Sequence, residues 1–187
     1  GRIMSAQQEI RLLLEAFQEG YIDRDVNRLD EFMEMFLPDI EMIGTPGLRQ
    51  GVNEWYTDRA GARELMVIDF ETWGDVRLEM ELASIRVNGE TGWIAVPATV
   101  TQTLGDERYA AWMQKARKLL DEPQLNAEQK TSQLAQNSAN LLFEMQRGNH
   151  FVWPLRITAV VVRQRDGWKF AQMHFSFPTE GLPGVRV

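Results

Sequence analysis

The sequence predicts an α+β domain in which helices pack against a curved, mixed and mostly antiparallel sheet. Helical periodicity fills the first third of the chain, and period-two alternation begins near residue 75. The order of helix, helix, strand, helix and then four long strands is typical of the α+β class. A stretch of helical sequence at about residues 105–150 interrupts the strands. We therefore expect a single domain over residues 1–187 that carries an inserted helical hairpin.

Two amphipathic helices are expected at the N-terminus. The segment Ser5–Gln8 has a capping-box pattern, and apolar residues then recur at helical spacing up to the helix breaker Gly20. Asp25 can cap a second helix, which should end before Pro38. Most aromatic side chains in these stripes are expected to face the core. Tyr21 lies at the end of its helix, and its hydroxyl needs a hydrogen-bond partner if it is buried. It is therefore a candidate pocket residue and a candidate partner in proton transfer.

The middle of the chain should change from helix to strand. A short strand is expected at residues 39–45 and a weaker helix at residues 52–65. The alternation that follows changes parity, which a β-bulge near Ala83-Ser84 would explain. Asn88-Gly89 predicts a tight hairpin, so residues 93–104 should return antiparallel.

The inserted segment contains two amphipathic stretches separated by Glu122-Pro123, and Asn126 with Gln129 can cap the second one. A packing or oligomerisation role is the simpler interpretation, because amphipathic helix pairs usually bury their apolar faces. A lid over a pocket is the functional alternative, since long excursions between strands are often functional.

The segment from residue 156 to residue 178 carries the strongest functional signal. It reads as two strands joined at Asp166-Gly167. Side chains at alternate positions of the second strand should share one face, which predicts a mixed aromatic and polar surface made of Trp168, Gln172, His174 and Ser176. Such a face suits the wall of a pocket better than a closed apolar core.

Several segments recur in an order that resembles a known family. They are Met35-Phe36, Ile43-Gly44-Thr45, Gly51, Asn88-Gly89 with Trp93, Arg156-Ile157-Thr158, and Arg165-Asp166-Gly167 with the strand to Pro178. Together they resemble the nuclear transport factor 2-like superfamily, specifically SnoaL-like proteins related to the association domain of calcium/calmodulin-dependent protein kinase II. The resemblance implies a cone-shaped, cystatin-like fold, a pocket between sheet and helices, and a homodimer formed through the sheet.

The resemblance also assigns roles to individual positions. The family's frequent residues on the last two strands correspond here to Trp168, His174, Ser176, Arg156 and Thr158. Many relatives have a second histidine where this chain has Gln172, and an acidic residue in a loop that is shortened here. The loss of two acid/base groups favours ligand binding over catalysis.

His174 is the natural candidate for a general acid or base, because histidine titrates near neutral pH. Its alternative is a purely structural histidine. Arg156 could bind a carboxylate ligand bidentately, or could form a structural salt bridge with Asp39 or Glu71.

Carboxylates offer a second route to proton chemistry. Asp39 and Glu41 share one face of a short strand, and steroid-isomerase-like members of the superfamily place a pocket carboxylate near this strand. Asp39 could instead simply start the strand, and Asp69 is a weaker candidate. An aromatic lining could come from three further residues, whose alternative is the core: Trp55, Tyr56 and Trp93.

Composition excludes several classes of function. The formal charge of −7 argues against a nucleic-acid surface, and no apolar run is long enough for a membrane span. With no cysteine and two histidines, we expect no metal, and the absence of phosphate-binding glycine motifs predicts no nucleotide cofactor. We expect a cytoplasmic protein, although a chain that begins with Gly1 leaves open a removed leader.

Three functions remain open from the sequence. The first is a homodimeric domain that binds an apolar small molecule bearing a carbonyl or anionic group. The second is a cofactor-free isomerase, cyclase or dehydratase that uses His174, with Asp39 or Tyr21, to move a proton. The third is an oligomeric assembly module. We regard catalysis as undecided from the sequence.

Overall fold

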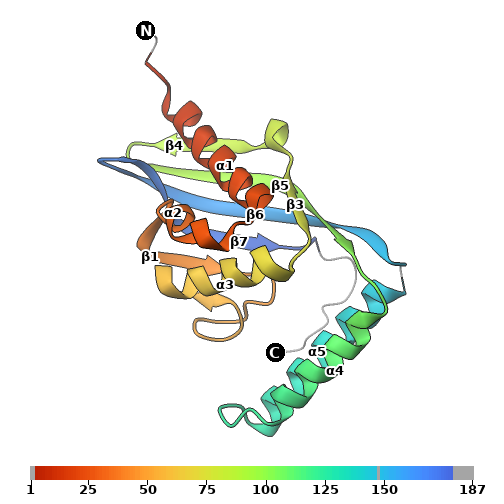
Figure 1. The fold of residues 1–187 in the computed structure, drawn as a ribbon. Helices are drawn as coiled ribbons and strands as arrows, with labels where there is room; N and C mark the ends of the chain where they lie inside the picture. The colour runs from red at the N-terminus through yellow and green to blue at the C-terminus, as the bar shows by residue number, and fades with distance from the viewer. Residues whose placement is uncertain (1–2, 147, 179–187) are drawn as a thin grey trace. The chain divides into compact units, whose positions relative to one another are not determined.

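The computed structural model describes residues 3–146 and 148–178. These residues divide into two compact units. The first, called the sheet unit, comprises residues 3–100 and 153–178, and the second, called the hairpin unit, lies within residues 101–152. The elements in chain order (Figure 1) are α1 (Ala6–Asp23), the 3-10 helix η1 (Val26–Arg28), α2 (Leu29–Met33), β1 (Phe36–Ile43), β2 (Trp55–Tyr56), α3 (Arg59–Thr72), β3 (Asp75–Leu78), the 3-10 helix η2 (Met80–Leu82), β4 (Ser84–Asn88), β5 (Thr91–Thr103), α4 (Glu107–Leu120), α5 (Ala127–Met145), β6 (His150–Gln164) and β7 (Gly167–Ser176).

Within the described residues, one mixed sheet contains all seven strands, in the order β2-β1-β7-β6-β5-β3, with β4 paired to β5. β1 and β7 run parallel, whereas β1 and β2, β4 and β5, and β6 and β7 run antiparallel. The expected hairpin at Asn88-Gly89 is present, because Asn88 pairs with Thr91 and Gly89 adopts a φ of +62°. The prediction of an α+β fold with a mixed, mostly antiparallel sheet is therefore confirmed.

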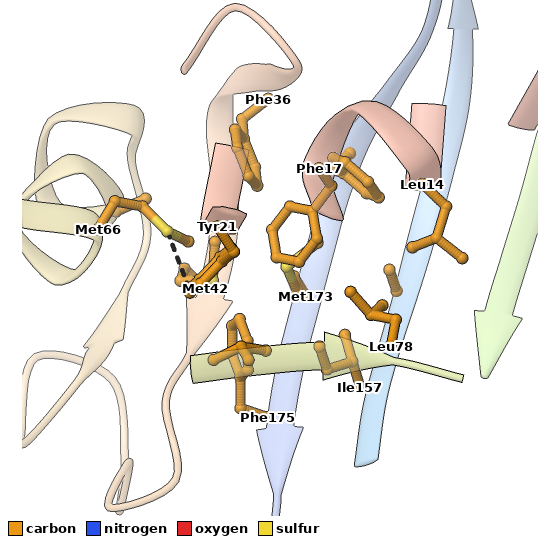
Figure 2. Close-up of a cluster of buried hydrophobic side chains, with 14 of the residues drawn as sticks. Leu14, Phe17, Tyr21, Phe36, Met42, Met66, Leu78, Ile157, Met173 and Phe175 are labelled. Atoms are coloured by element: carbon orange, nitrogen blue, oxygen red, sulfur yellow. Dashed lines mark hydrogen bonds between the residues drawn. The ribbon is translucent and has the colours of Figure 1, made fainter. Parts of the chain in front are cut away.

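The helices of the sheet unit pack against one face of the sheet, which we call the inner face. Phe17 of α1 lies 5.7 Å, between ring centroids, from Phe170 of β7 and 6.4 Å from Phe175. Met173 of β7 and Ile157 of β6 point into the same cluster, which Figure 2 shows around the end of α1. The opposite face of the sheet, called the outer face, carries the intervening side chains of the same strands.

The ends of the helices differ from the sequence-based expectation. Gly20 lies inside α1 and does not end it. Its lack of a side chain leaves the space in which the Phe32 ring packs against the helix. The helix instead ends at Asp23, where Arg24 adopts a left-handed conformation with φ +52°. The second helix is short, so β1 begins already at Phe36, before the expected strand at residues 39–45.

The third helix begins later than expected. Asp58 caps it by accepting a hydrogen bond of 2.7 Å from the amide of Gly61, and α3 then runs to Thr72. The expected helix at residues 52–65 was wrong over its first half, where a loop and β2 lie instead. The capping boxes at Ser5 and Asn126 are both present as predicted.

An irregularity in β7 changes which face its side chains occupy. Val160 of β6 pairs with Gln172 while Val161 pairs with Phe170, so Ala171 is an extra residue that shifts the register. Such a bulge reverses the alternation of the strand. The prediction that Trp168 shares a face with Gln172 was therefore wrong: Trp168 lies on the inner face and is 6% exposed.

The hairpin unit contains α4 and α5 and the ends of β5 and β6. The indole Nε1 of Trp112 donates a 3.0 Å hydrogen bond to the hydroxyl of Ser138, which joins the two helices. No residue of α4 is buried, and on α5 only Leu141 is. No helix within residues 3–146 and 148–178 has the length and apolar character that a membrane crossing needs.

Candidate functional site

A cavity of about 150 Å³ lies in the sheet unit beside α3. Leu65 and Asp69 of α3 and Phe175 of β7 form its buried part, whereas Ile68 and Thr72 are exposed and lead to the surface. The full lining is Gly44, Thr45, Pro46, Glu54, Leu65, Ile68, Asp69, Thr72, Trp73 and Phe175. A cavity of this volume is about as large as an engineered cavity that accommodates benzene, so it suits a compact ligand.

Asp69 is the central polar group of this cavity. The residue is 6% exposed, and its Oδ2 accepts a 2.6 Å hydrogen bond from the hydroxyl of Tyr21. The same hydroxyl lies 3.3 Å from the sulfur of Met66, as the dashed line in Figure 2 shows. Tyr21 is itself fully buried and does not line the cavity. The tyrosine therefore fixes the carboxyl without lining the cavity.

The environment makes Asp69 a group that titrates near neutral pH. Burial raises the pKa of this carboxyl from 3.8 to about 7, because a low-dielectric surrounding disfavours the charged form. This value already includes the hydrogen bond from Tyr21 and the charge of Arg24, which lower the pKa, and the charge of Glu54, which raises it. Burial, followed by the charge of Asp69, raises the pKa of Tyr21 well above 10. Carboxyls with such a pKa are candidates for proton chemistry.

Arg24 fixes the end of the helix that carries Asp69. Its Nη2 donates hydrogen bonds to the backbone oxygens of Asp69 (2.8 Å), Trp73 (2.9 Å) and Gly74 (2.7 Å). These carbonyls belong to the C-terminal end of α3, where a cation is favourable. We call this arrangement the Arg24 clamp. It ties the end of α1 to the last turn of α3.

A second polar cluster lies on the outer face of the sheet. Oε2 of Glu41 accepts 3.2 Å hydrogen bonds from the indole of Trp55 and the amide of Gln50. Its Oε1 accepts a hydrogen bond from Gln172. These bonds, with that of Gln172 the largest, lower the pKa of Glu41. The cluster is therefore built around a carboxylate that stays charged.

His174 lies beside this cluster and away from the cavity. It is exposed and pairs with Thr158 across β6 and β7, while Ser176 pairs with Arg156. Burial and then the charge of Arg156 lower the pKa of His174. The guanidinium of Arg156 donates a 3.5 Å hydrogen bond to the backbone oxygen of Phe177. These four predicted site residues, His174, Thr158, Ser176 and Arg156, thus share the outer face, as the sequence suggested, but none of them lines the cavity beside α3.

The other predicted site residues are scattered. The indole of Trp168 donates a 2.9 Å hydrogen bond to Glu9 and so joins β7 to α1. Tyr56 packs against the core, and Trp93 is 44% exposed. Asp39 is exposed in the irregular part of β1, where the pairing with β7 shifts register between Phe36 and Glu41.

Asp69 could have been recognised from the sequence. The buried stripe of α3 consists of Ala62, Leu65, Met66, Asp69 and Phe70, which follow helical spacing. A carboxylate inside an apolar stripe is a signal for a special environment. The signal was hidden because the helix was expected to end at residue 65, before Asp69 was reached.

Metal chemistry has no preformed site in the described part of the chain. Residues 3–146 and 148–178 contain no group of three or more His, Asp or Glu side chains that could hold a metal ion.

Comparisons with known proteins agree with this architecture. A sequence model of the SnoaL-like domain matches residues 10–110, which is more than half of the chain. None of the curated proteins compared matches it.

Solved structures with a similar fold cover almost the whole chain. A nuclear transport factor 2-like superfamily protein from Salmonella enterica is 12% identical, with 97% of both chains covered and a TM-score of 0.58. A ketosteroid isomerase-like protein from Erwinia carotovora atroseptica is 12% identical, with 95% of this chain and 100% of the other covered and a TM-score of 0.55. The CaMKII hub of S. rosetta is 11% identical, with 95% and 100% covered and a TM-score of 0.56. At these identities the similarity shows the nuclear transport factor 2-like fold.

Proposed function

The chain belongs to the SnoaL-like domain family, and on that basis we propose that it binds a small molecule in the cavity beside Asp69. One observation carries the proposal: a buried carboxyl, hydrogen-bonded by Tyr21, lines a cavity that opens to the surface. A cavity that combines apolar walls with a few placed polar groups is the usual form of a ligand site. The apolar part of the ligand would contact Leu65, Trp73 and Phe175.

The polar group of the ligand would meet Asp69. The sequence led us to expect a carbonyl or anionic group bound by Arg156, but Arg156 lies on the outer face and does not line the cavity. A carbonyl oxygen could accept a hydrogen bond from Asp69 when that carboxyl is protonated. An anionic group would have no positively charged lining residue to meet, so the proposal does not retain it for this cavity.

A block of the cavity mouth tests the binding function. Ile68→Trp places a large side chain at the exposed part of the lining, and Glu71→Trp adds the same side chain at an exposed position of α3 outside the lining. We expect ligand-observed NMR with compact fragments, about the size of benzene, to detect binders that lose affinity in Ile68→Trp and keep it in Glu71→Trp. Equal binding to both variants would contradict a site in this cavity.

Proton transfer is a second candidate function, and the pKa of Asp69 near 7 favours it. A general acid or base works best when its pKa is close to the working pH. In this version the proton is moved by Asp69, with Tyr21 as its hydrogen-bond partner, in place of His174. One protein of this fold is described as ketosteroid isomerase-like. The test is proton exchange at a carbon next to a carbonyl in a bound ketone, which should disappear in Asp69→Asn.

We also propose that the chain forms a homodimer through the outer face of the sheet. Trp93 is 44% exposed there, and large exposed aromatic side chains are enriched at interfaces. Light scattering should show a dimer that Trp93→Glu converts to a monomer. Leu82→Glu, at an apolar residue that is 60% exposed on η2, is the matched control and should remain dimeric. A parent chain that is monomeric in solution would contradict this proposal.

A further inference from the structure

The hairpin unit carries a row of exposed apolar side chains in addition to those with which its two helices pack. Helices α4 and α5 run side by side (Figure 1), and the indole of Trp112 donates a 3.0 Å hydrogen bond to Ser138 between them. Leu119, two turns further along the same side of α4, is half-buried. An ion pair of 3.9 Å between Arg108 and Glu144 also joins the two helices. Three large apolar residues of α4 stay exposed, namely Tyr109 (42%), Met113 (59%) and Leu120 (54%).

These exposed side chains form one narrow row along α4. At 3.6 residues per turn, they and the half-buried Ala116 lie within about 60° of one another around the helix. We call this row the α4 stripe, and its members are Tyr109, Met113, Ala116 and Leu120. The opposite side of the helix is polar, with Glu107, Gln114 and Lys118. An apolar row that stays exposed beside a polar side is typical of an interaction surface.

The spacing within the α4 stripe indicates the kind of partner. Successive members are four, three and four residues apart, which is the a and d pattern of a coiled coil. This spacing is the same in both directions along the helix. A surface with such symmetry can pack on itself across a two-fold axis, as an interface between two identical copies requires. The same helix of a second copy, running antiparallel, therefore fits the stripe.

The antiparallel arrangement also suits the side chains themselves. Tyr109 would lie opposite Leu120 of the second copy, because both are equally far from the centre of the stripe. Met113 would lie opposite Ala116 in the same way, and a long side chain facing a small one favours interdigitated packing. Arg117 flanks the stripe away from its centre, so the arginines of the two copies are not brought opposite each other. The contact therefore buries apolar groups without pairing like charges.

The exposed area of the stripe fits a weak contact. About half of each of its three large side chains is exposed, which leaves roughly 300 Å² open per copy if a large side chain has about 200 Å² of surface. Two copies, with the atoms that flank the stripe, would bury about 600–1,000 Å² in total, at the low end for specific interfaces. We therefore expect a Kd on the order of 100 µM.

We propose that the hairpin unit carries a self-association surface, in which α4 of one copy packs antiparallel on α4 of another along the α4 stripe. This surface is made by other residues than the cavity beside Asp69 and the outer face of the sheet, so it does not rest on either proposal made for them. Where the outer face holds a dimer, the α4 contact would join such dimers into larger assemblies at high concentration.

The experiment uses the full chain with Trp93→Glu, which removes the proposed sheet contact and leaves the hairpin unit unchanged. Sedimentation velocity should show a monomer at about 5 µM and a dimer at about 500 µM, on either side of the expected Kd. Adding Met113→Glu places a charge in the centre of the contact and should raise the Kd at least about tenfold. Gln114→Glu adds the same charge on the polar side and should leave the Kd within about twofold. Circular dichroism should show equal helix content in both variants.

Introduced thiols test the direction of the two helices. The chain has no cysteine, so Tyr109→Cys and Leu120→Cys each add a single thiol. Under mild oxidation at the higher concentration, a mixture of the two variants should cross-link, because these positions lie opposite each other in the antiparallel contact. Each variant alone should cross-link much less, because its two thiols would be about 16 Å apart along the helix, too far for a disulfide.

Several outcomes would overturn the inference. They are a Trp93→Glu chain that stays monomeric at the higher concentration, and a dimer that Met113→Glu and Gln114→Glu weaken equally. Self-cross-linking of Tyr109→Cys as efficient as that of the mixture would rule out the antiparallel contact. Binding to vesicles of phosphatidylcholine and phosphatidylglycerol without self-association would assign the stripe to a membrane surface instead. A dimer that only Met113→Glu dissociates, with cross-linking in the mixture, would support it.

Discussion

Asp69→Asn should change how the stability of the protein depends on pH. In the folded protein Asp69 keeps its proton up to a pKa of about 7, whereas the ordinary value, expected in the unfolded chain, is 3.8. Between these values the folded state binds one more proton than the unfolded state, so the contribution of this group to the free energy of unfolding falls as the pH rises. One pKa unit corresponds to about 1.4 kcal/mol, so a pKa difference of about 3 lowers the free energy of unfolding by about 4 kcal/mol as the pH rises through this range.

Asparagine cannot ionise, but its amide oxygen can still accept the hydrogen bond from Tyr21. The free energy of unfolding of the variant minus that of the parent should therefore rise by about 4 kcal/mol between pH 4 and pH 8. Urea denaturation at a series of pH values measures it, and taking the difference cancels all unaffected groups. Asp166→Asn is the control and should show no rise, because Lys169 lowers the pKa of Asp166. A difference that stays constant over this range would refute the burial argument.

Three other substitutions test the remaining parts of the site. Tyr21→Phe should lower the free energy of unfolding by about 1–2 kcal/mol. It should also raise the pKa of Asp69 above 7, because the hydrogen bond that is removed stabilises the charged carboxylate. A carbon-13 NMR titration of the carboxyl measures this pKa, and an unchanged value would argue against the hydrogen bond. Arg24→Gln should remove the Arg24 clamp, cost about 1–3 kcal/mol and speed amide hydrogen exchange in the last turn of α3, whereas unchanged protection would show that the clamp is dispensable. His174→Ala should leave the Kd of fragments that bind in the cavity within about twofold of the parent value, well under the 1.4 kcal/mol that corresponds to tenfold. A large loss of affinity would indicate that the ligand site lies on the outer face.

Local signals in the sequence were reliable, because they depend on a few neighbouring residues. The capping boxes at Ser5 and Asn126 and the hairpin at Asn88-Gly89 are all present. Each depends only on residues within four positions of one another. The helical hairpin was also predicted from a local signal, because the helical periodicity of its two amphipathic segments lies within each segment.

The candidate site depended on non-local structure and was harder to predict. The extra residue Ala171 reverses the alternation of β7, and only the pairing with β6 reveals it. Strict alternation therefore grouped Gln172 and His174 correctly but added Trp168, which belongs to the core. The position of α3 also depends on the loop before it, so Asp69 could not be placed in the cavity from the pattern alone.

The Arg24 clamp has a consequence for the rate at which a ligand enters. Because one side chain joins the ends of α1 and α3, the last turn of α3, which carries the lining residues Asp69 and Thr72, cannot move away from α1 without breaking hydrogen bonds to three carbonyls. The wall formed by residues 44–54 is held differently: the Gly44 amide donates a 2.7 Å hydrogen bond to the backbone oxygen of Glu54, and Gln50 donates an exposed one to Glu41 of β1. We expect substitutions in this loop to change association and dissociation rates together with little change in Kd, whereas loss of the clamp should change Kd itself, a division that stopped-flow kinetics with a bound fragment would reveal.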